Sequence, residues 1–285
     1  SSPTQHGYKV MHSTITALLP LVTKVAIGFN EKKPASRTAT VSLDISKAFD
    51  AVNHDLLLSK ISNTPLHSNI VRWMAAYLRG RTAVCLFQGA TSPQFTCHSG
   101  VPQGSVLSPH LFNFFLHDFP APAQLNLIYA DDINLSESSS DVPSLGPLLT
   151  DHLTKVSEWS KDNKLKIAPE KSVVTLYTPN TREANTDPGV FYEGIPIPVD
   201  RKPKWLGFTI SNLGSPTPHL DNAVTKCNPG IQIMKAIKGQ DWGDKETLRL
   251  TFNTLVRPVL EYAAPIYFPI TGPEASSICR LQNVQ

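Results

Sequence analysis

The stretch LNLIYADDINL, Leu125–Leu135, places two adjacent acidic residues between two short apolar runs. Such a pattern predicts two antiparallel strands that meet at a tight turn around Asp131 and Asp132. A second β-rich run, ATVSLDI at Ala39–Ile45, also ends beside an acid, Asp44. The acidic pair alone leaves two interpretations open, because Asp-Asp suits the tip of a hairpin and also suits a cation site.

The third carboxylate, Asp44, favours the cation-site interpretation over a simple hairpin tip. A buried or half-buried carboxylate needs a cation or hydrogen-bond donors around it. No His or Cys stands beside Asp44, Asp131 or Asp132, and an all-oxygen ligand set favours Mg²⁺ or Mn²⁺ over zinc. Two such ions about 4 Å apart would stabilise the attacking and leaving oxygens of a phosphoryl transfer.

Composition narrows the class of protein. The 285 residues are 41% hydrophobic and 17% charged, which is typical of a globular protein and not of a disordered one. The most apolar candidate, Thr16–Phe29, is interrupted by Pro20 and Lys24, so we predict no membrane span. The four cysteines are scattered without a C-x-x-C pair, which argues against a zinc cluster and suits a reducing compartment.

Charge is unevenly distributed along the chain. Residues 82–154 contain no Lys or Arg and six acids, whereas residues 1–81 contain ten basic and four acidic residues. This partition indicates either a cation-binding centre flanked by surfaces that hold a polyanion, or chance clustering of surface charge.

Two further segments complete a set of ordered motifs. A Gly-Val-Pro-Gln-Gly loop at residues 100–104 precedes a strongly apolar helix predicted over 106–119. A later apolar strand is predicted over 171–177 and begins with Lys171. Taken together, the motifs resemble the reverse transcriptase of non-LTR (LINE-type, jockey-like) retrotransposons. The matching segments are LDISKAFDAVNH (43–54), SGVPQGSVLSPHLFNFFLHDF (99–119), IYADDINL (128–135), KLKIAPEKSVVTLYT (164–178) and KWLGFTI (204–210), with QHGYKVMHSTITALL (5–19) resembling the segment before the palm.

The resemblance implies a right-hand polymerase of α+β class. We expect partial fingers at 1–40, a palm at 41–214 built on an antiparallel sheet with helices packed on one face, and a truncated helical thumb or connection at 215–285. We also expect the chain to be a piece of a longer polyprotein that lacks an upstream fingers segment, an upstream endonuclease and a downstream ribonuclease H.

The implied activity is that of an RNA-directed DNA polymerase, which adds dNTPs to a primer 3′-hydroxyl by two-metal phosphoryl transfer during retrotransposition. Asp44 and Asp131 would bind both ions, Asp132 would complete the acidic face, and the backbone carbonyl of Ile45 would be a further ligand. Mg²⁺ is the expected cofactor, with Mn²⁺ as the alternative.

The resemblance also assigns substrate-binding residues. Phe49 would stack under the nucleotide sugar and exclude a 2′-hydroxyl, although its position also suits a core aromatic. Gln103 and Gly104 would lie against the templating base and the incoming nucleotide. Lys171 would approach the triphosphate, although it could equally be an exposed lysine at a strand edge.

Nucleic-acid contacts are expected from the palm and the thumb. Gly100, Lys204, Trp205 and Gly207 would lie along the RNA template or DNA primer, although Trp205 equally suits the palm core. Scattered basic residues would contact phosphates: Lys202, Lys204, Lys226, Lys235, Lys238, Lys245 and Arg249. The missing fingers segment favours an alternative function, a catalytically inactive nucleic-acid-binding remnant. The family's work at chromosomal target sites implies a nuclear location.

Overall fold

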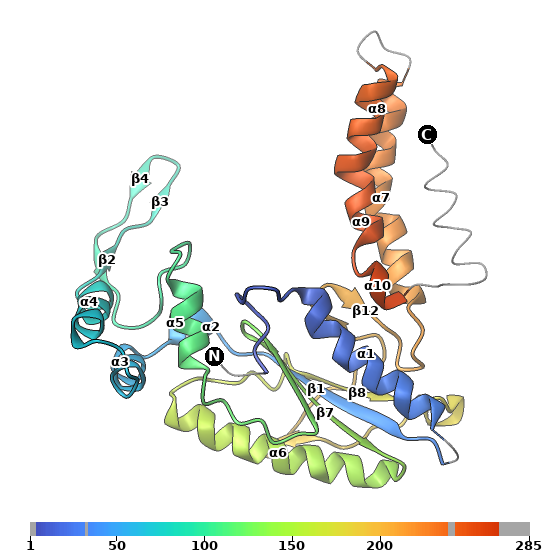
Figure 1. Ribbon diagram of the computed structural model, residues 1–285, viewed down its shortest axis with the longest axis horizontal. Helices are drawn as coiled ribbons and strands as arrows, with labels where there is room; N and C mark the ends of the chain where they lie inside the picture. Colours follow the sequence, from blue (N-terminus) through green and yellow to red (C-terminus); the bar gives the residue numbers. More distant parts are fainter. Residues whose placement is uncertain (1–3, 32–33, 239–242, 268–285) are drawn as a thin grey trace.

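An antiparallel sheet of four strands forms the centre of the computed structural model, which describes residues 4–31, 34–238 and 243–267. The strands lie in the order β6–β7–β1–β8 (Figure 1). Leu43 pairs with Ile133, so the end of β1 lies beside the start of β7. The strand bounds are Arg37–Leu43 for β1, Leu125–Tyr129 for β6, Asp132–Ser139 for β7 and Val173–Tyr177 for β8.

The two faces of the sheet are covered by different helices. Side chains alternate along each strand, and Val41 and Leu135 point into the main core, where α6 (Val142–Asp162) packs. The α+β palm architecture predicted from the sequence is confirmed. The expectation of helices on one face is corrected, because α1 (Thr14–Asn30) packs on the opposite face against β1 and β6. The chain can place a helix there because Leu127 and other apolar side chains of that face join those of α1 in a second core.

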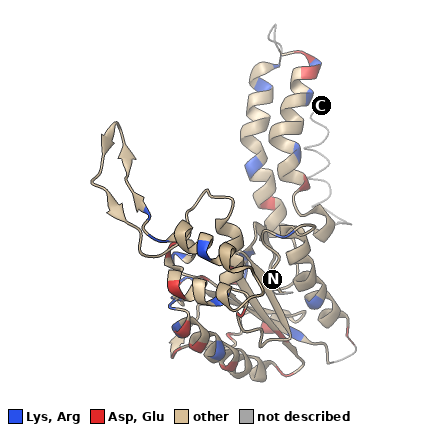
Figure 2. Ribbon diagram, turned by 60° about the vertical axis from the view of Figure 1, so that its left-hand side comes forward, with Lys and Arg blue, Asp and Glu red and all other residues tan. Residues whose placement is uncertain are grey.

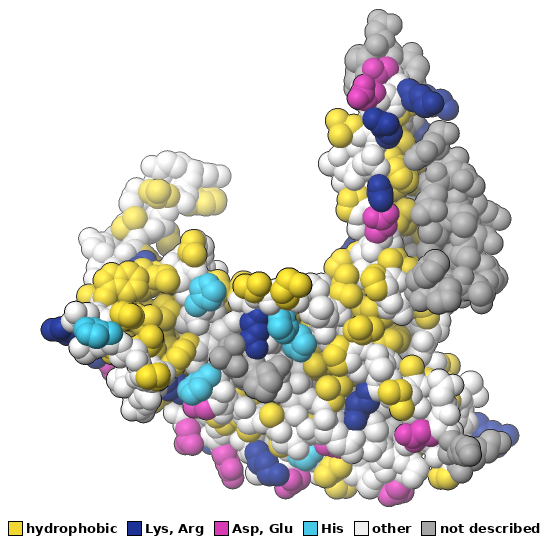
Figure 3. All heavy atoms as spheres, in the orientation of Figure 1, with side chains coloured by type: hydrophobic (Ala, Val, Ile, Leu, Met, Phe, Trp, Pro, Cys, Tyr) yellow, Lys and Arg dark blue, Asp and Glu magenta, His cyan; other side chains and the backbone are white. Residues whose placement is uncertain are grey.

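Short helices and small β-ribbons project from the end of β1 (Figure 1). Figure 2 shows few charged residues on these β-ribbons, as expected from the absence of Lys and Arg from residues 82–154. Figure 3 shows apolar side chains gathered over this region, where Leu86 is 75% exposed. The elements are α2 (Ala48–Ala51), α3 (His54–Ser62), α4 (Ser68–Leu78), paired β2 (Thr82–Ala83) and β5 (Phe95–Thr96), paired β3 (Leu86–Phe87) and β4 (Ala90–Thr91), and α5 (Ser108–Phe115).

The segment after β8 contains two small hairpins. The sequence predicts one strand over 205–210, but the structure has a turn in its middle. Leu206 and Gly207 have φ angles of 47° and 80°, and two successive left-handed residues close a tight hairpin. The elements are η1 (Thr181–Glu183), β9 (Phe191–Tyr192), β10 (Ile195–Pro196), β11 (Lys204–Trp205) and β12 (Phe208–Thr209).

A pair of long antiparallel helical segments rises from the sheet after residue 216 (Figure 1). The first is α7 (Thr217–Ile237), and buried side chains such as Cys227 and Phe252 join it to the second. The second segment contains a wider, π-helical turn at Phe252–Val256 just before Pro258. Proline has no N–H to donate the regular helical hydrogen bond, so the regular α-helix is interrupted there. This segment consists of α8 (Lys245–Thr251), the π-helical η2 (Phe252–Val256) and α9 (Arg257–Glu261), followed by α10 (Ala264–Tyr267). No helix within the described ranges is long and apolar enough to cross a membrane.

Candidate active site

The predicted acidic turn lies at the tip of the β6–β7 hairpin. Tyr129 pairs with Asp132, which leaves Ala130 and Asp131 as the two residues of the turn. Ala130 has a φ of 56°, in the left-handed region that residues other than glycine rarely enter. Asp131 is exposed on this turn, so its carboxylate is accessible to a ligand.

Asp44 reaches the same place from β1. The Leu43–Ile133 pair and the alternation of side chains put Asp44 and Asp132 next to each other on one face of the sheet. Partial burial, and then the charges of Asp131 and Asp44, raise the pKa of Asp132. The three predicted carboxylates are therefore neighbours.

These acids form an open group, not a closed cage. Within residues 4–31, 34–238 and 243–267, no three His, Cys, Asp or Glu side chains lie at the spacing of an assembled metal cluster. The donor set nevertheless fits a hard cation, because Asp44, Asp131 and Asp132 offer only oxygen atoms. Their mutual repulsion is what a divalent ion would relieve.

Asp44 is anchored by the loop before β8. Its N–H donates to Ser172 Oγ at 3.2 Å, and its carbonyl accepts from the Ala168 N–H at 2.9 Å. Ser172 is fully buried, and its hydroxyl donates to the Ala168 carbonyl at 2.8 Å. The next residue, Ile45, bridges to Ile167 of the same loop. The backbone around Asp44 is therefore held on both sides.

The glycine-rich loop docks against the segment that follows Asp44. The Gly100 N–H donates to the Val52 carbonyl at 2.8 Å. A Cβ on Gly100 would lie 2.9 Å from the backbone of Asp50, and its φ is 88°. The close approach that this glycine permits is thus to the protein backbone, and its contact with nucleic acid stays a prediction.

Gln103 and Gly104 lie on the exposed part of the same loop. Gln103 Nε2 donates to Asp50 Oδ1 at 3.0 Å. A Cβ on Gly104 would meet no atom within 4 Å, and its φ of 85° explains the glycine. The loop therefore presents a side-chain amide and an open backbone to solvent.

The remaining predicted substrate residues differ in exposure. Phe49 is half-buried and stacks on Phe112 with ring centroids 4.5 Å apart, so one face belongs to the core. Lys171 is exposed directly before the buried Ser172.

The β11–β12 hairpin packs against the helical segment at the end of the described chain. Gly207 is exposed, and a Cβ there would lie 3.4 Å from the ring of Tyr262. The Tyr262 hydroxyl donates to the Leu206 carbonyl. Trp205 is 6% exposed in the second core, as the core interpretation expects, and its contact with nucleic acid stays a prediction. Lys204 is exposed.

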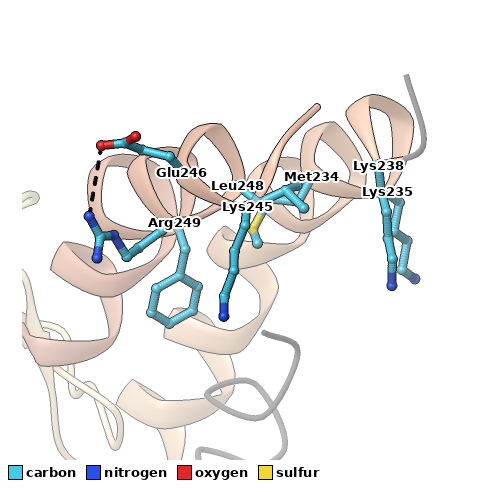
Figure 4. A pocket seen from close by; sticks show the side chains of 8 residues that line it. Met234, Lys235, Lys238, Lys245, Glu246, Leu248 and Arg249 are labelled. Carbon is cyan, nitrogen blue, oxygen red and sulfur yellow. Dashed lines mark ion pairs between the residues drawn. The ribbon is translucent and has the colours of Figure 1, made fainter. Parts of the chain in front are cut away.

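A cavity of about 640 Å³ lies between α7 and α8, far along the helical pair (Figure 4). Its floor is apolar, formed by Met234, Leu248 and Phe252. Glu246 lies 4.0 Å from the guanidinium of Arg249. We call the four basic residues that line it the thumb cations: Lys235, Lys238, Lys245 and Arg249.

Comparison with protein families decides the identity of this arrangement. The model of the family described as reverse transcriptase (RNA-dependent DNA polymerase) matches residues 1–210. The chain belongs to the reverse transcriptase family. The matched range contains all three carboxylates and the glycine-rich loop, so the predicted resemblance is confirmed.

Named relatives of this reverse transcriptase come from insect mobile elements. The probable RNA-directed DNA polymerase from transposon BS of Drosophila melanogaster is 29% identical over 98% of the chain, which spans 31% of that relative. The RNA-directed DNA polymerase from mobile element jockey of Drosophila funebris is 28% identical over 71% of the chain and 22% of its own length. The jockey-like grouping predicted from the sequence is therefore confirmed.

Solved structures agree at the level of the fold. The telomerase from Candida tropicalis, solved with a fragment of telomeric RNA, has a TM-score of 0.52 and 11% identity, covering 99% of this chain and 53% of that one. At this identity the likeness shows a shared fold only.

Sequence reasoning does not identify Ser172 as part of this reverse transcriptase site. A serine before an apolar strand is unremarkable in a single sequence. Its role depends on Asp44, which lies 128 positions away. The available signal is its position directly after Lys171 in the segment 164–178 that matches the family.

Proposed function

We propose that this chain is an RNA-directed DNA polymerase that adds deoxynucleotides to a primer 3′-hydroxyl as part of retrotransposition. The observation that supports it most is the meeting of Asp44, Asp131 and Asp132 at one edge of the sheet, where partial burial and then the two neighbouring charges raise the pKa of Asp132. Like charges gathered at an accessible edge are stabilised by a divalent cation, which is what phosphoryl transfer requires.

Mg²⁺ is the proposed cation, with Mn²⁺ as a substitute, because the candidate ligands are all oxygen atoms. Asp44 and Asp131 would hold two such ions, with Asp132 completing the acidic face and the Ile45 carbonyl as a further ligand. Bound ions supply Lewis-acid activation of the primer hydroxyl and neutralise triphosphate charge. The protein's own part is positioning, since the hydrogen bonds between Asp44 and the Ser172 loop fix one ligand relative to the hairpin.

The nucleotide would lie between the acidic edge and the glycine-rich loop. Phe49 presents its uncovered side while Phe112 supports the other face, so a ribose 2′-hydroxyl would meet a rigid ring. The Gln103 amide would exchange its exposed Asp50 partner for the nucleotide or template base. Gly104 leaves room beside it, and the Lys171 ammonium would neutralise or protonate the leaving pyrophosphate.

The RNA template and DNA primer would cross from the β11–β12 hairpin to the thumb. Gly207 and Lys204 are exposed there, and the thumb cations lie farther along the helical pair (Figure 4). Such contacts give salt-dependent binding with little sequence preference. We further propose that the chain works in the nucleus, beside endonuclease and ribonuclease H domains of a longer polyprotein.

Primer extension on an RNA template with dNTPs and Mg²⁺ tests the proposal. We expect wild type to extend the primer and Asp131→Asn to lose activity by at least about a hundredfold. Asp151→Asn is the matched control, because Asp151 is an acid 64% exposed on α6, away from the carboxylate edge. Wild type that extends no more than Asp131→Asn contradicts the proposal.

A second function, nucleic-acid binding without catalysis, is supported by the thumb cations, which require no metal. It predicts salt-dependent binding of primer–template by both wild type and Asp131→Asn, without incorporation by either. The same preparations measured by fluorescence anisotropy and by extension distinguish the two functions.

A further inference from the structure

The N-terminal segment of the described chain lies against the acidic hairpin. The His6 N–H donates to the Ile128 carbonyl at 2.7 Å, and the Ile128 N–H donates to the Thr4 carbonyl at 2.9 Å. Gln5 forms a parallel bridge with Ile128. Residues more than 120 positions apart therefore form one hydrogen-bonded unit directly before the turn.

Gln5 bonds both polar backbone groups of Ala130. It is 2% exposed, its Oε1 accepts from the Ala130 N–H at 3.1 Å, and its Nε2 donates to the Ala130 carbonyl at 3.3 Å. The same Oε1 accepts from the Gly7 N–H at 2.7 Å. One buried amide thus satisfies three backbone groups.

Ala130 needs such a partner because of its conformation. Its φ of 56° is unfavourable for a residue with a Cβ. Asp131 and Asp132 follow directly, so a change in the Ala130 backbone would rotate both carboxylates. Bonds to the N–H and the carbonyl of one residue hold its peptide orientation on both sides.

The segment is itself fixed by close packing. A Cβ on Gly7 would lie 2.5 Å from the Ala130 nitrogen, so only glycine allows this approach. Asn113 of α5 donates to the Gly7 carbonyl at 2.7 Å and is 7% exposed. The N-terminal segment, α5 and the acidic hairpin therefore meet at Gln5 and Gly7.

We propose that Gln5 is a positioning residue that acts through Ala130 to hold Asp131 and Asp132 in the orientation required for catalysis. This inference rests on the proposed polymerase function. It assigns to the Gln5–Gly7 segment a role in shaping the metal-binding hairpin, in place of a role confined to the fingers.

Gln5→Met tests the inference, because methionine fills a similar volume without making the three bonds. Gln124→Met is the matched control. Gln124 bonds the N–H and carbonyl of Ser138 at 3.3 Å each, near the opposite end of the same hairpin. Extension rates at varied Mg²⁺ and dNTP, and hydrogen exchange of a peptide containing Ala130, are measured for both variants.

We expect Gln5→Met to lower kcat about 10- to 100-fold, since a small misplacement of a catalytic group has effects of this size. The Mg²⁺ concentration for half-maximal rate should rise several-fold, and exchange at residues 129–132 should accelerate. Gln124→Met should change none of these. A merely structural role would lower the unfolding temperature without shifting the Mg²⁺ dependence.

Gly7→Ala provides a second route, because the added methyl pushes the segment from Ala130 while Gln5 remains. It should reproduce the kcat and Mg²⁺ effects. An active wild type with Gln5→Met at wild-type kcat overturns the inference and leaves the polymerase function intact. An inactive wild type contradicts the polymerase function, and hydrogen exchange then still tests whether Gln5 holds the hairpin; unchanged exchange in Gln5→Met overturns that.

Discussion

The Ser172→Ala substitution tests whether Ser172 positions the backbone of Asp44, because it removes a hydrogen bond to that backbone and leaves the Asp44 carboxylate unchanged. The Ser172 hydroxyl accepts from the Asp44 N–H at 3.2 Å and donates to the Ala168 carbonyl at 2.8 Å. The Ala168 carbonyl would keep the N–H groups of Lys171 and Ser172, at 3.1 and 3.0 Å. The loss therefore falls mainly on the Asp44 N–H.

An unsatisfied buried donor costs about 1–3 kcal/mol. Because the bond to Asp44 is long, at 3.2 Å, we expect the free energy of unfolding to fall by about 1–2 kcal/mol. At roughly 2–4 °C per kcal/mol, the unfolding temperature should drop by about 2–8 °C. The freed backbone beside Asp44 should also lower kcat about tenfold.

Thermal unfolding and primer extension measure the two effects. Ser160→Ala is the matched control, because Ser160 is 3% exposed and its hydroxyl donates to the Ser157 carbonyl at 2.8 Å, on α6. It should lose comparable stability and keep its kcat. Equal kcat values for the two variants would refute the reasoning that Ser172 supports Asp44.

Three other predictions concern stability and binding. Hydrogen bonds, the largest from Arg37, lower the pKa of Glu183 from 4.5 to about 2, so this pair stabilises the fold above about pH 4.5 and its contribution is lost as pH falls towards 2. In Glu183→Gln, the free energy of unfolding measured in urea should therefore change less with pH across that range, and a pH dependence equal to that of wild type would argue against the prediction. Gly146→Ala would place a Cβ 1.8 Å from the Pro188 carbonyl oxygen. This clash should outweigh the gain of about 1 kcal/mol in helix propensity and destabilise the protein by about 1–3 kcal/mol. A variant that unfolds at or above the wild-type temperature would contradict this prediction. Glutamine at all four thumb cations should reduce the slope of log Kd against log salt by about 1–3, and an identical slope would show that they contact no phosphate.

The carboxylate hairpin could be predicted from the sequence because its information is local. Apolar runs on each side of Asp131 and Asp132 specify two strands and a turn, and the motif order adds Asp44. The β9–β10 hairpin had a local signal too, since Glu193-Gly194 separates two short apolar pairs, and both residues have positive φ.

Other features depend on long-range contacts that one sequence does not contain. The helix predicted over 106–119 ends at Phe115. Gln5 and Ser172 are ordinary polar residues until the fold brings them to Ala130 and Asp44. The burial of Trp205 likewise follows from α1 covering the second face of the sheet, a packing that the apolar spacing of that helix does not specify.

The most direct test of the central claim is single-nucleotide incorporation on an RNA template by wild type and by Asp44→Asn, Asp131→Asn and Asp132→Asn at saturating Mg²⁺. The account predicts incorporation by wild type and a loss in each variant that retains wild-type unfolding temperature and primer–template affinity. Incorporation by a variant at the wild-type rate, or none by wild type, would contradict it.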